Sequence, residues 1–231
     1  MNRTFLNQLT ELIRGTPRKV TLVAVTKGIG VEEMNRAIEA GVNAIGENRV
    51  EEFEKKFPLL PPVEKHFIGQ IQSRKIKRIV ELFDCIQSVS SIEHLERIEK
   101  EAVAQNKAIK ILLQFNISGE EQKGGFSQEE LGEMLISNDS LSANSCELAD
   151  KDKAISATHD VKIVGVMGIA TETKDSEIVR KQFRLLKDIR DRLHAEFPEI
   201  IELSMGMSGD YGVALEEGST ILRIGRALFN D

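Results

Sequence analysis

Lys27 is the residue whose position most favours chemistry. It follows the strand-like run Val20–Thr26 and precedes Gly28. An amine at the mouth of a buried strand is desolvated, and desolvation lowers the pKa of an ammonium group and makes the free amine a better nucleophile toward an aldehyde. A Schiff-base lysine needs this property. The alternative is an ordinary lysine extending into water, and the run alone favours that alternative because most lysines are surface residues.

Two stretches near the end of the sequence have the composition of an anion site. Residues 204–209 read Ser-Met-Gly-Met-Ser-Gly, and residues 223–226 read Arg-Ile-Gly-Arg. Glycines let backbone N–H groups converge, Ser204 and Ser208 supply hydroxyls, and a helix opening at Gly225 would add free N–H groups. The stretches predict a phosphate cradle. The alternative is a pair of glycine-rich turns with serine caps.

Two other polar features have simpler interpretations. His66 is expected to be a half-buried histidine with satisfied hydrogen bonds, as histidine is intermediate in burial. The basic run at 74–78, which contains Arg74, Lys75, Lys77 and Arg78, is expected to be a solvated helix face. Contact with an anionic partner is the alternative for this run.

Short apolar runs alternate with amphipathic patterns along the chain. The expected strands are Val20–Thr26, Ala44–Glu47, His66–Gly69, Cys85–Val89, Ile109–Ile117, Val161–Ala170, Ile201–Met205 and Ile221–Ile224. The expected helices include Thr4–Arg14, Val31–Ala40, Ser91–Asn106 and Asp175–Phe197.

This alternation predicts the α/β class and a single (β/α)8 TIM barrel, with an extra N-terminal helix before the first strand. A doubly wound open sheet is the alternative, but no glycine-rich dinucleotide fingerprint follows the first strand. Functional groups of such barrels gather at the carboxyl ends of the strands, and the loops after strands seven and eight often hold phosphate. The barrel would therefore place Lys27 and the phosphate cradle at the same end.

The whole chain, residues 1–231, is expected to form one domain. Residues 138–160 are rich in Ser, Asn and Asp, with few large apolar side chains, and are expected to form a surface loop insertion.

Composition excludes several classes of partner. The net charge of −6 argues against general nucleic-acid binding. No apolar run reaches the roughly 20 residues that cross a bilayer, and the N-terminus has no apolar signal-peptide region. Cys85 and Cys146 show neither metal-ligand spacing nor a disulfide framework, which suits a reducing compartment. We therefore expect a cytoplasmic monomer without a metal site, a membrane partner or a nucleic-acid partner.

The chain resembles the family of pyridoxal 5′-phosphate (PLP) homeostasis proteins, also called the YggS/PROSC family. The matching stretches run from the first expected strand to the last, so the resemblance covers nearly the whole chain. They are Leu22–Lys27, Gly46–Asn48, His66–Gly69 with Gln72 and Lys75, Gln114–Ser118, Lys123 with Gly125, Gly165–Met167, Leu203–Ser208, Gly218–Thr220 and Arg223–Gly225.

The resemblance implies a barrel like the N-terminal domain of alanine racemase, with PLP held as a Schiff base on Lys27. It also implies that Arg223 approaches the pyridine nitrogen, where a cation disfavours protonation and makes the ring a weaker electron sink. The remaining cofactor-binding residues that it implies are Asn48 beside the ring and Ser204, Met205, Ser208, Gly225 and Arg226 toward the phosphate. The family usually has Thr at position 226 and Asn at position 74, so the role of Arg226 stays open.

Two functions follow from the resemblance. The first is a PLP-binding protein that takes part in intracellular PLP homeostasis. It holds PLP reversibly and delivers it to PLP-dependent apoenzymes, and none of its residues is expected to be catalytic. The second is a PLP-dependent amino-acid racemase, which needs a second acid/base opposite the lysine. In the resembling racemases a tyrosine of a C-terminal domain plays this part, whereas this chain ends at Asp231 and contains only Tyr211. We therefore expect PLP binding with negligible racemisation. A structural barrel that has lost its ligand is a third possibility.

Overall fold

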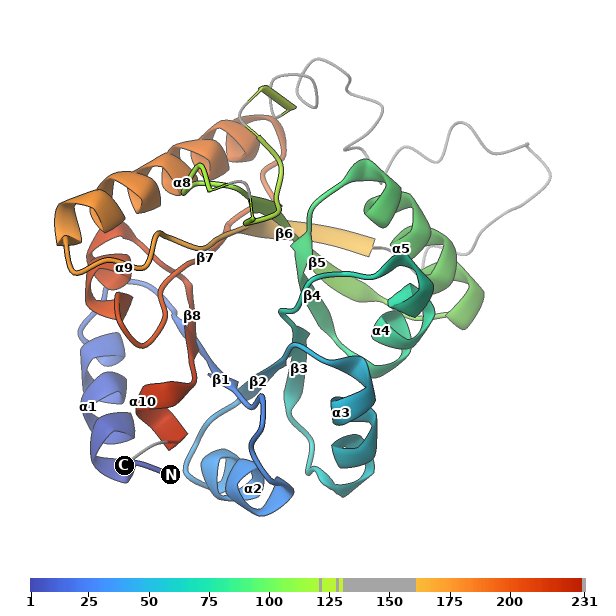
Figure 1. Ribbon diagram of the computed structural model, residues 1–231, viewed down its shortest axis with the longest axis horizontal. Helices are drawn as coiled ribbons and strands as arrows, with labels where there is room; N and C mark the ends of the chain where they lie inside the picture. The colour runs from blue at the N-terminus through green and yellow to red at the C-terminus, as the bar shows by residue number, and fades with distance from the viewer. Residues whose placement is uncertain (121, 128, 131–160, 230–231) are drawn as a thin grey trace.

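A closed barrel of parallel strands organises this protein. The computed structural model describes residues 1–120, 122–127, 129–130 and 161–229, and within them eight strands pair in sequence order, with β8 closing on β1 (Figure 1). The strands are β1 (Thr21–Val25), β2 (Ala44–Glu47), β3 (Glu64–Phe67), β4 (Cys85–Val89), β5 (Ile109–Phe115), β6 (Val161–Gly168), β7 (Glu202–Ser204) and β8 (Ile221–Ile224). Closure confirms the predicted barrel and shows that the open-sheet alternative is wrong.

Two strand boundaries differ from the prediction in ways that matter for the site. The third strand begins at Glu64 and ends at Phe67, two residues earlier than predicted, so His66 lies inside it. The first strand ends at Val25, and Lys27 therefore follows in a turn instead of standing directly at the strand end.

The helices surround the barrel, and α1 is the predicted extra N-terminal helix (Figure 1). Asn2 caps α1 by accepting a hydrogen bond from the Phe5 N–H, and its own N–H donates to the Leu228 carbonyl at 2.7 Å, which joins α1 to the chain's last helix. The helices are α1 (Arg3–Arg14), α2 (Val31–Glu39), α3 (Val50–Lys56), α4 (Ile76–Leu82), α5 (Ile92–Gln105), α8 (Ser176–Glu196), α9 (Tyr211–Glu217) and α10 (Arg226–Phe229), with short 3₁₀ turns η1 (Phe57–Leu59) and η2 (Ser73–Lys75).

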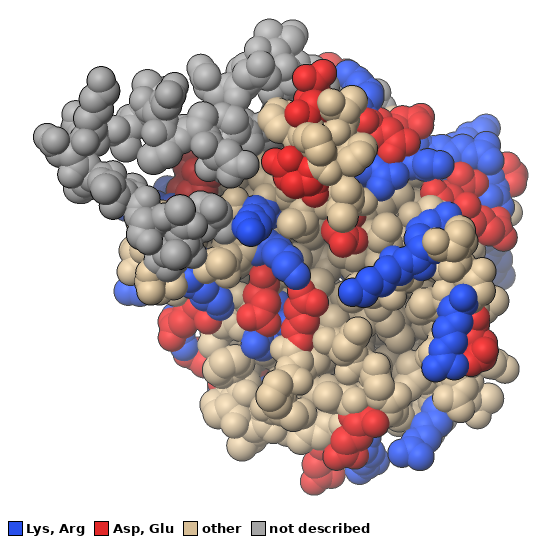
Figure 2. Space-filling model, turned by 180° about the vertical axis from the view of Figure 1, so that it is seen from behind, with Lys and Arg blue, Asp and Glu red and all other residues tan. Residues whose placement is uncertain are grey.

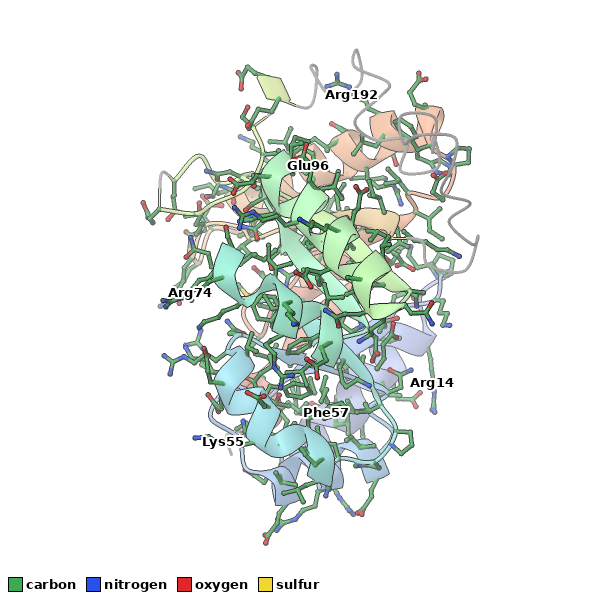
Figure 3. All side chains as sticks on the ribbon, turned by 90° about the vertical axis from the view of Figure 1, so that its right-hand side faces the viewer. Arg14, Lys55, Phe57, Arg74, Glu96 and Arg192 are labelled. Carbon is green, nitrogen blue, oxygen red and sulfur yellow. The ribbon has the colours of Figure 1, made fainter. Side chains whose placement is uncertain are left out.

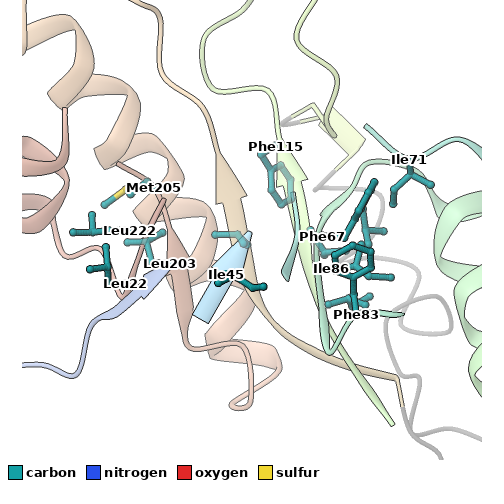
Figure 4. Packing of buried hydrophobic residues seen from close by; sticks show 14 of the residues in the cluster. Leu22, Ile45, Phe67, Ile71, Phe83, Ile86, Phe115, Leu203, Met205 and Leu222 are labelled. Atoms are coloured by element: carbon teal, nitrogen blue, oxygen red, sulfur yellow. The ribbon is translucent and has the colours of Figure 1, made fainter. Parts of the chain in front are cut away.

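The core has two layers because neighbouring strand residues face opposite sides of the sheet. Outward-facing side chains such as Leu22, Phe67 and Leu222 pack against the helices (Figure 4). A smaller cluster formed by inward-facing residues fills part of the barrel interior: Val23, Ala44, Cys85, Leu112, Met167 and Ile221. Burial raises the pKa of the Cys85 thiol, which keeps it in the unreactive protonated form.

In the basic run at 74–78, Arg74 and Lys77 are exposed, while Lys75 and Arg78 are half-buried and pair with acidic side chains. The Lys75 ammonium lies 2.7 Å from a Glu51 carboxylate oxygen, and Arg78 pairs with Glu54 of α3 and with Glu81. Arg74 projects outward on the same side as Lys55 (Figure 3). On the face that Figure 2 shows, acidic and basic side chains are likewise interspersed.

Within the described ranges, no helix has the length and apolar character of a membrane span, and no cluster of three or more His, Cys, Asp or Glu side chains is placed to bind a metal ion. The predicted insertion at 138–160, together with Cys146, lies outside the described residues.

Candidate functional site

A cavity of about 430 Å³ opens at the carboxyl ends of the strands, where the barrel fold places functional groups. Its walls come from the segments that follow β1, β6 and β7 and from β8 with the start of α10. Apolar side chains of Val25, Ile29, Ile169 and Phe229 form part of the lining. The predicted residues that it brings together are Lys27, Ser208, Arg223, Gly225 and Arg226.

Lys27 lies in an exposed turn at the rim of this cavity. Gly28, with φ of +74°, adopts a left-handed conformation that favours glycine, and its N–H donates to a Glu52 carboxylate oxygen at 3.0 Å. Lys27 is exposed, contrary to the burial expected for it, because the strand ends one residue earlier than expected and the side chain lies in solvent. Within the described residues, its amine has no ion-pair partner and is accessible to a ligand in the cavity.

A charged cluster holds the Lys27 turn from behind. The cluster consists of Glu47, Glu52 and Lys56, and we call it the turn cluster. The Lys56 ammonium lies 3.3 Å from the fully buried Glu47 carboxylate, 2.8 Å from Glu52 and 3.4 Å from the Thr26 carbonyl. Burial raises the pKa of Glu47, and the Lys56 charge opposes this effect. The cluster thus fixes the backbone on both sides of Lys27 and leaves the Lys27 side chain free.

Arg223 provides a buried cation at the opposite side of the cavity. It is 4% exposed, and its guanidinium donates through Nη2 to the Gly168 carbonyl at 2.9 Å and through Nη1 to the Ser204 hydroxyl. Burial lowers the pKa of Arg223 to about 10, against the opposing charge of Asp210. The guanidinium therefore remains a cation at neutral pH, in a fixed orientation.

Three predicted residues do not line the cavity. Asn48 is exposed in the segment after β2. Ser204 is fully buried, and its hydroxyl is used by Arg223 and Gln87. Met205 packs its side chain into the hydrophobic core, near Leu203 and Leu222 (Figure 4). Ser204 and Met205 were expected at the end of the seventh strand and toward the phosphate, but neither lines the cavity, and the segment after β7 reaches it only from residue 207 onward.

Gly206 explains how this loop turns toward the cavity. Its φ is +98°, and a Cβ at this position would lie 2.5 Å from the Cβ of Ala214 and 2.7 Å from Leu222 Cδ2. Only glycine suits both the backbone conformation and the space. After this turn, the Ser208 hydroxyl accepts a hydrogen bond from the Ala227 N–H at 3.3 Å, which links the β7 loop to α10.

Further charged residues complete the lining. Lys123 was not among the predicted cofactor-binding residues, and its ammonium is held at 2.6 Å from Glu120 and 2.9 Å from the Ala170 carbonyl. Arg226 is 81% exposed and lies 3.7 Å from the Glu172 carboxylate, so its side chain has room to reorient toward a ligand. Lys123 is one of the residues that carry the family resemblance, and this could have identified it as a site residue. Its place in the cavity, however, depends on how the loop after β5 folds.

His66 differs from the expectation of a half-buried, satisfied histidine. It is 3% exposed, because β3 places it inside the barrel, and its Nδ1 lies 2.6 Å from Gln87 Nε2. Among the residues that the structure describes, its Nε2 atom has no hydrogen-bond partner.

Comparison with known proteins agrees with this geometry. The family model for the alanine racemase N-terminal domain matches residues 5–231. Pyridoxal phosphate homeostasis protein of Vibrio alginolyticus is 35% identical over 221 residues, which cover 93% of this chain and 87% of the relative. That of Aquifex aeolicus is 35% identical over 213 residues, covering 91% and 86%. The chain belongs to the pyridoxal phosphate homeostasis protein family.

Solved structures place this family member among similar barrels. PipY of Synechococcus elongatus with PLP bound is 29% identical with a TM-score of 0.81, covering 98% of this chain and 100% of that one. An alanine racemase of Clostridium difficile superimposes with a TM-score of 0.72 at 15% identity, covering 99% of this chain and 55% of the racemase. The second likeness shows a shared fold alone.

Proposed function

We propose that this PLP homeostasis family member binds PLP reversibly in the cavity and takes part in PLP homeostasis without catalytic turnover. One observation carries the proposal: the exposed Lys27 amine shares a single cavity with the fixed Arg223 cation and with the hydroxyl of Ser208. Relatives that are named for PLP homeostasis, and the PLP-bound structure of PipY, support it.

The donor set of the cavity fits PLP. An aldehyde requires a free amine, and Lys27 is the accessible one at the rim. A phosphate requires hydroxyl, backbone and cationic donors, which Ser208, Gly225 and Arg226 offer on one side. A planar ring requires apolar walls, which Val25 and Ile169 supply.

Each residue then has a definable role. Lys27 would hold the aldehyde carbon through its amine, and Ser208, Gly225 and Arg226 would hold the phosphate. When bound, PLP supplies an electrophilic aldehyde and an electron-withdrawing ring. Arg223 only donates hydrogen bonds, so it would leave the pyridine nitrogen unprotonated and weaken this electron withdrawal. The chain's own groups thus favour holding the cofactor over stabilising a carbanion.

The residues that do not line the cavity have supporting roles in this proposal. Ser204 orients Arg223 through the hydrogen bond to its hydroxyl. The Met205 carbonyl accepts a hydrogen bond from the Ser219 hydroxyl at 2.7 Å, and the Met205 N–H donates to the Ile221 carbonyl at 3.2 Å. Met205 therefore anchors the β7 loop through its backbone. Asn48, which is exposed after β2, is proposed beside the cofactor ring on the strength of the family resemblance.

In this chain the racemase alternative would need a second acid/base opposite Lys27, a part that a tyrosine plays in the resembling racemases. Tyr211, the chain's single tyrosine, packs edge-on against Phe5 of α1 with ring centroids 5.8 Å apart and does not line the cavity. Tyr211 is thus not placed to act as that second acid/base. The proposal therefore includes a single domain over residues 1–231, a monomeric cytoplasmic carrier, and PLP-dependent apoenzymes as recipients.

Absorbance titration with PLP tests the cofactor assignment. Wild-type protein is expected to develop the visible band of lysine-bound PLP, and borohydride is expected to trap the cofactor on Lys27. The Lys27→Ala variant is expected to show neither, whereas Lys19→Ala, which removes another exposed lysine far from the cavity lining, is expected to match wild type. A wild-type protein that PLP cannot colour would overturn the proposal.

Chirality measurements test the claim of no turnover. The PLP-loaded protein is incubated with several L-amino acids, and the D-enantiomer is quantified over time. We expect no formation above that of free PLP. Robust racemisation that disappears in Lys27→Ala would establish the enzyme alternative instead.

A further inference from the structure

A chain of buried polar side chains crosses the barrel interior behind Arg223. It runs from Arg223 on β8 through Ser204 on β7 and Gln87 on β4 to His66 on β3, and we call these four residues the polar chain. Ser204 and Gln87 are fully buried, while His66 and Arg223 are 3% and 4% exposed. No water reaches most of these atoms, so each donor needs a protein acceptor.

The direction of the hydrogen bonds along the polar chain is fixed at Arg223. A guanidinium has only donors, so the Ser204 oxygen accepts from Arg223 Nη1. The Ser204 hydroxyl hydrogen is then directed to Gln87 Oε1, 2.6 Å away. The Gln87 amide consequently presents Nε2–H to His66 Nδ1, also 2.6 Å away. His66 Nδ1 must accept, so the ring proton lies on Nε2.

The reverse orientation of Gln87 is disfavoured at both of its ends. With the amide reversed, Ser204 would accept from both Arg223 and Gln87, and its hydroxyl hydrogen would lose its acceptor. His66 would then carry its proton on Nδ1 and turn the lone pair of Nε2 toward Glu64, whose carboxylate lies 3.6 Å away. A lone pair facing a carboxylate is repulsive, whereas an N–H facing it is attracted.

Glu64 lies beyond His66 at the far end of the polar chain, 3.6 Å from its Nε2. The interaction with His66, with help from Lys110 at 3.1 Å, lowers the pKa of Glu64 to about 2 despite partial burial. The polar chain therefore lies between a cation at Arg223 and an anion at Glu64, and all of its dipoles point the same way.

We propose that Gln87 is a positioning residue for the Arg223 guanidinium, and that His66, as the Nε2–H tautomer, locks the orientation of the Gln87 amide. The consequence for ligand binding rests on the proposed PLP site. Gln87 does not touch the cavity, and it acts by holding the Ser204 hydroxyl in the acceptor orientation that Arg223 needs. Arg223 then faces a ligand without paying for reorientation.

Nitrogen NMR of 15N-histidine-labelled protein without cofactor tests the tautomer directly. The chain has four histidines, and the His66 ring is assigned by its disappearance in His66→Asn. We expect Nδ1 to be unprotonated and Nε2 to carry the ring proton. The Gln87→Glu variant keeps an acceptor for Ser204 but cannot donate to His66, so its Nδ1 is expected to become protonated. A residue that merely fills space would not move this proton.

Binding measurements test the consequence for Arg223. We expect Gln87→Leu to bind PLP about fivefold more weakly than wild type, which corresponds to the loss of one hydrogen bond. The matched control is Ser88→Ala. Ser88 follows Gln87 on β4, and its buried hydroxyl donates a hydrogen bond to the Gly69 carbonyl, outside the polar chain. This control is expected to retain wild-type affinity even if it lowers the melting temperature.

The outcomes separate this inference from the PLP proposal. If wild-type His66 carries its proton on Nδ1, or if Gln87→Leu binds PLP as tightly as wild type, the inference is wrong. If wild-type protein does not bind PLP at all, the PLP proposal fails, and the tautomer measurement on the unliganded protein still decides the polarity of the chain. That measurement needs no substitution at Gln87, so it stands even if those variants do not fold.

Discussion

The two sides of the cavity present positive charge in opposite ways. Lys27 is exposed on a turn, and the charges that stabilise that turn bind its backbone and leave the side chain alone. Arg223 is buried in a strand, and its own guanidinium takes part in the supporting hydrogen bonds. The backbone at Lys27 is held in place while its amine is free, whereas the guanidinium of Arg223 is itself fixed by hydrogen bonds.

This difference matches the proposed exchange of cofactor. A group that forms and breaks a bond with an aldehyde must be reachable by water and by incoming amines. A group that sets the electronic state of the ring must hold one position, because electrostatic effects depend on distance and orientation. In the proposed exchange, the protein thus uses Lys27 to attach the cofactor and Arg223 to set the electronic state of its ring. Different residues support Lys27 and Arg223, so substitutions can test the two roles separately.

The largest expected effect comes from breaking the turn cluster. Lys56→Ala leaves the fully buried Glu47 carboxylate without its cation, and we expect a loss of about 3 kcal/mol in the free energy of unfolding at pH 7. Urea unfolding measures it. Because protonated Glu47 no longer needs a cation, the deficit should shrink as pH falls through the raised pKa of Glu47.

The neighbouring exposed residue provides the control. Lys55→Ala removes a lysine from the same helix and is expected to change stability by less than about 0.5 kcal/mol. Equal losses in the two variants would show that Glu47 does not depend on Lys56. A second substitution, Glu47→Gln, should recover part of the loss in Lys56→Ala but destabilise the otherwise wild-type protein.

An intermediate effect is expected at the far end of the polar chain. The pKa of Glu64 falls from 4.5 to about 2 in the folded protein, so its charge stabilises the fold above pH 4.5, and the stabilisation is lost as pH falls from 4.5 toward 2. Glu64→Gln is expected to lose about 1 kcal/mol at pH 7, since solvent screens a side chain that is one-third exposed.

Unfolding at pH 7 and at pH 3 checks this prediction, with Glu199→Gln as an exposed control. We expect the difference between Glu64→Gln and wild type to be smaller at pH 3. A difference that does not depend on pH would mean that Glu64 contributes through packing and that its charge is not coupled to His66.

The sequence predicted the barrel because its evidence was periodic and local. Strand-length apolar runs separated by amphipathic helices require only the spacing of residue types, and capping residues such as Ser91 and Asp175 begin α5 and α8 where expected. Lys27, Ser208 and Arg223 line one cavity because the carboxyl ends of barrel strands meet at one end, and their roles toward PLP remain predictions.

The sequence could not show how deeply individual side chains are buried. The point where a strand ends, and the side of the sheet that each residue faces, decide whether a side chain lies in solvent or inside the barrel. Lys27 is exposed in the turn after β1, whereas His66 faces the barrel interior from within β3. Gln87 was missed for a different reason: its neighbours in the polar chain are 21 and 117 residues away in sequence, and no local pattern brings them together.

The smallest expected effect is the one that most sharpens the comparison. Lys27→Ala, measured without PLP, should change the free energy of unfolding by no more than about 0.5 kcal/mol, because the exposed side chain makes no ion pair within the described part of the chain. The same substitution is expected to abolish attachment of PLP. A loss approaching that of Lys56→Ala would mean that the lysine side chain itself supports the turn. A negligible loss would instead show that the protein builds its turn from Glu47, Glu52 and Lys56 alone and keeps the Lys27 amine available for chemistry.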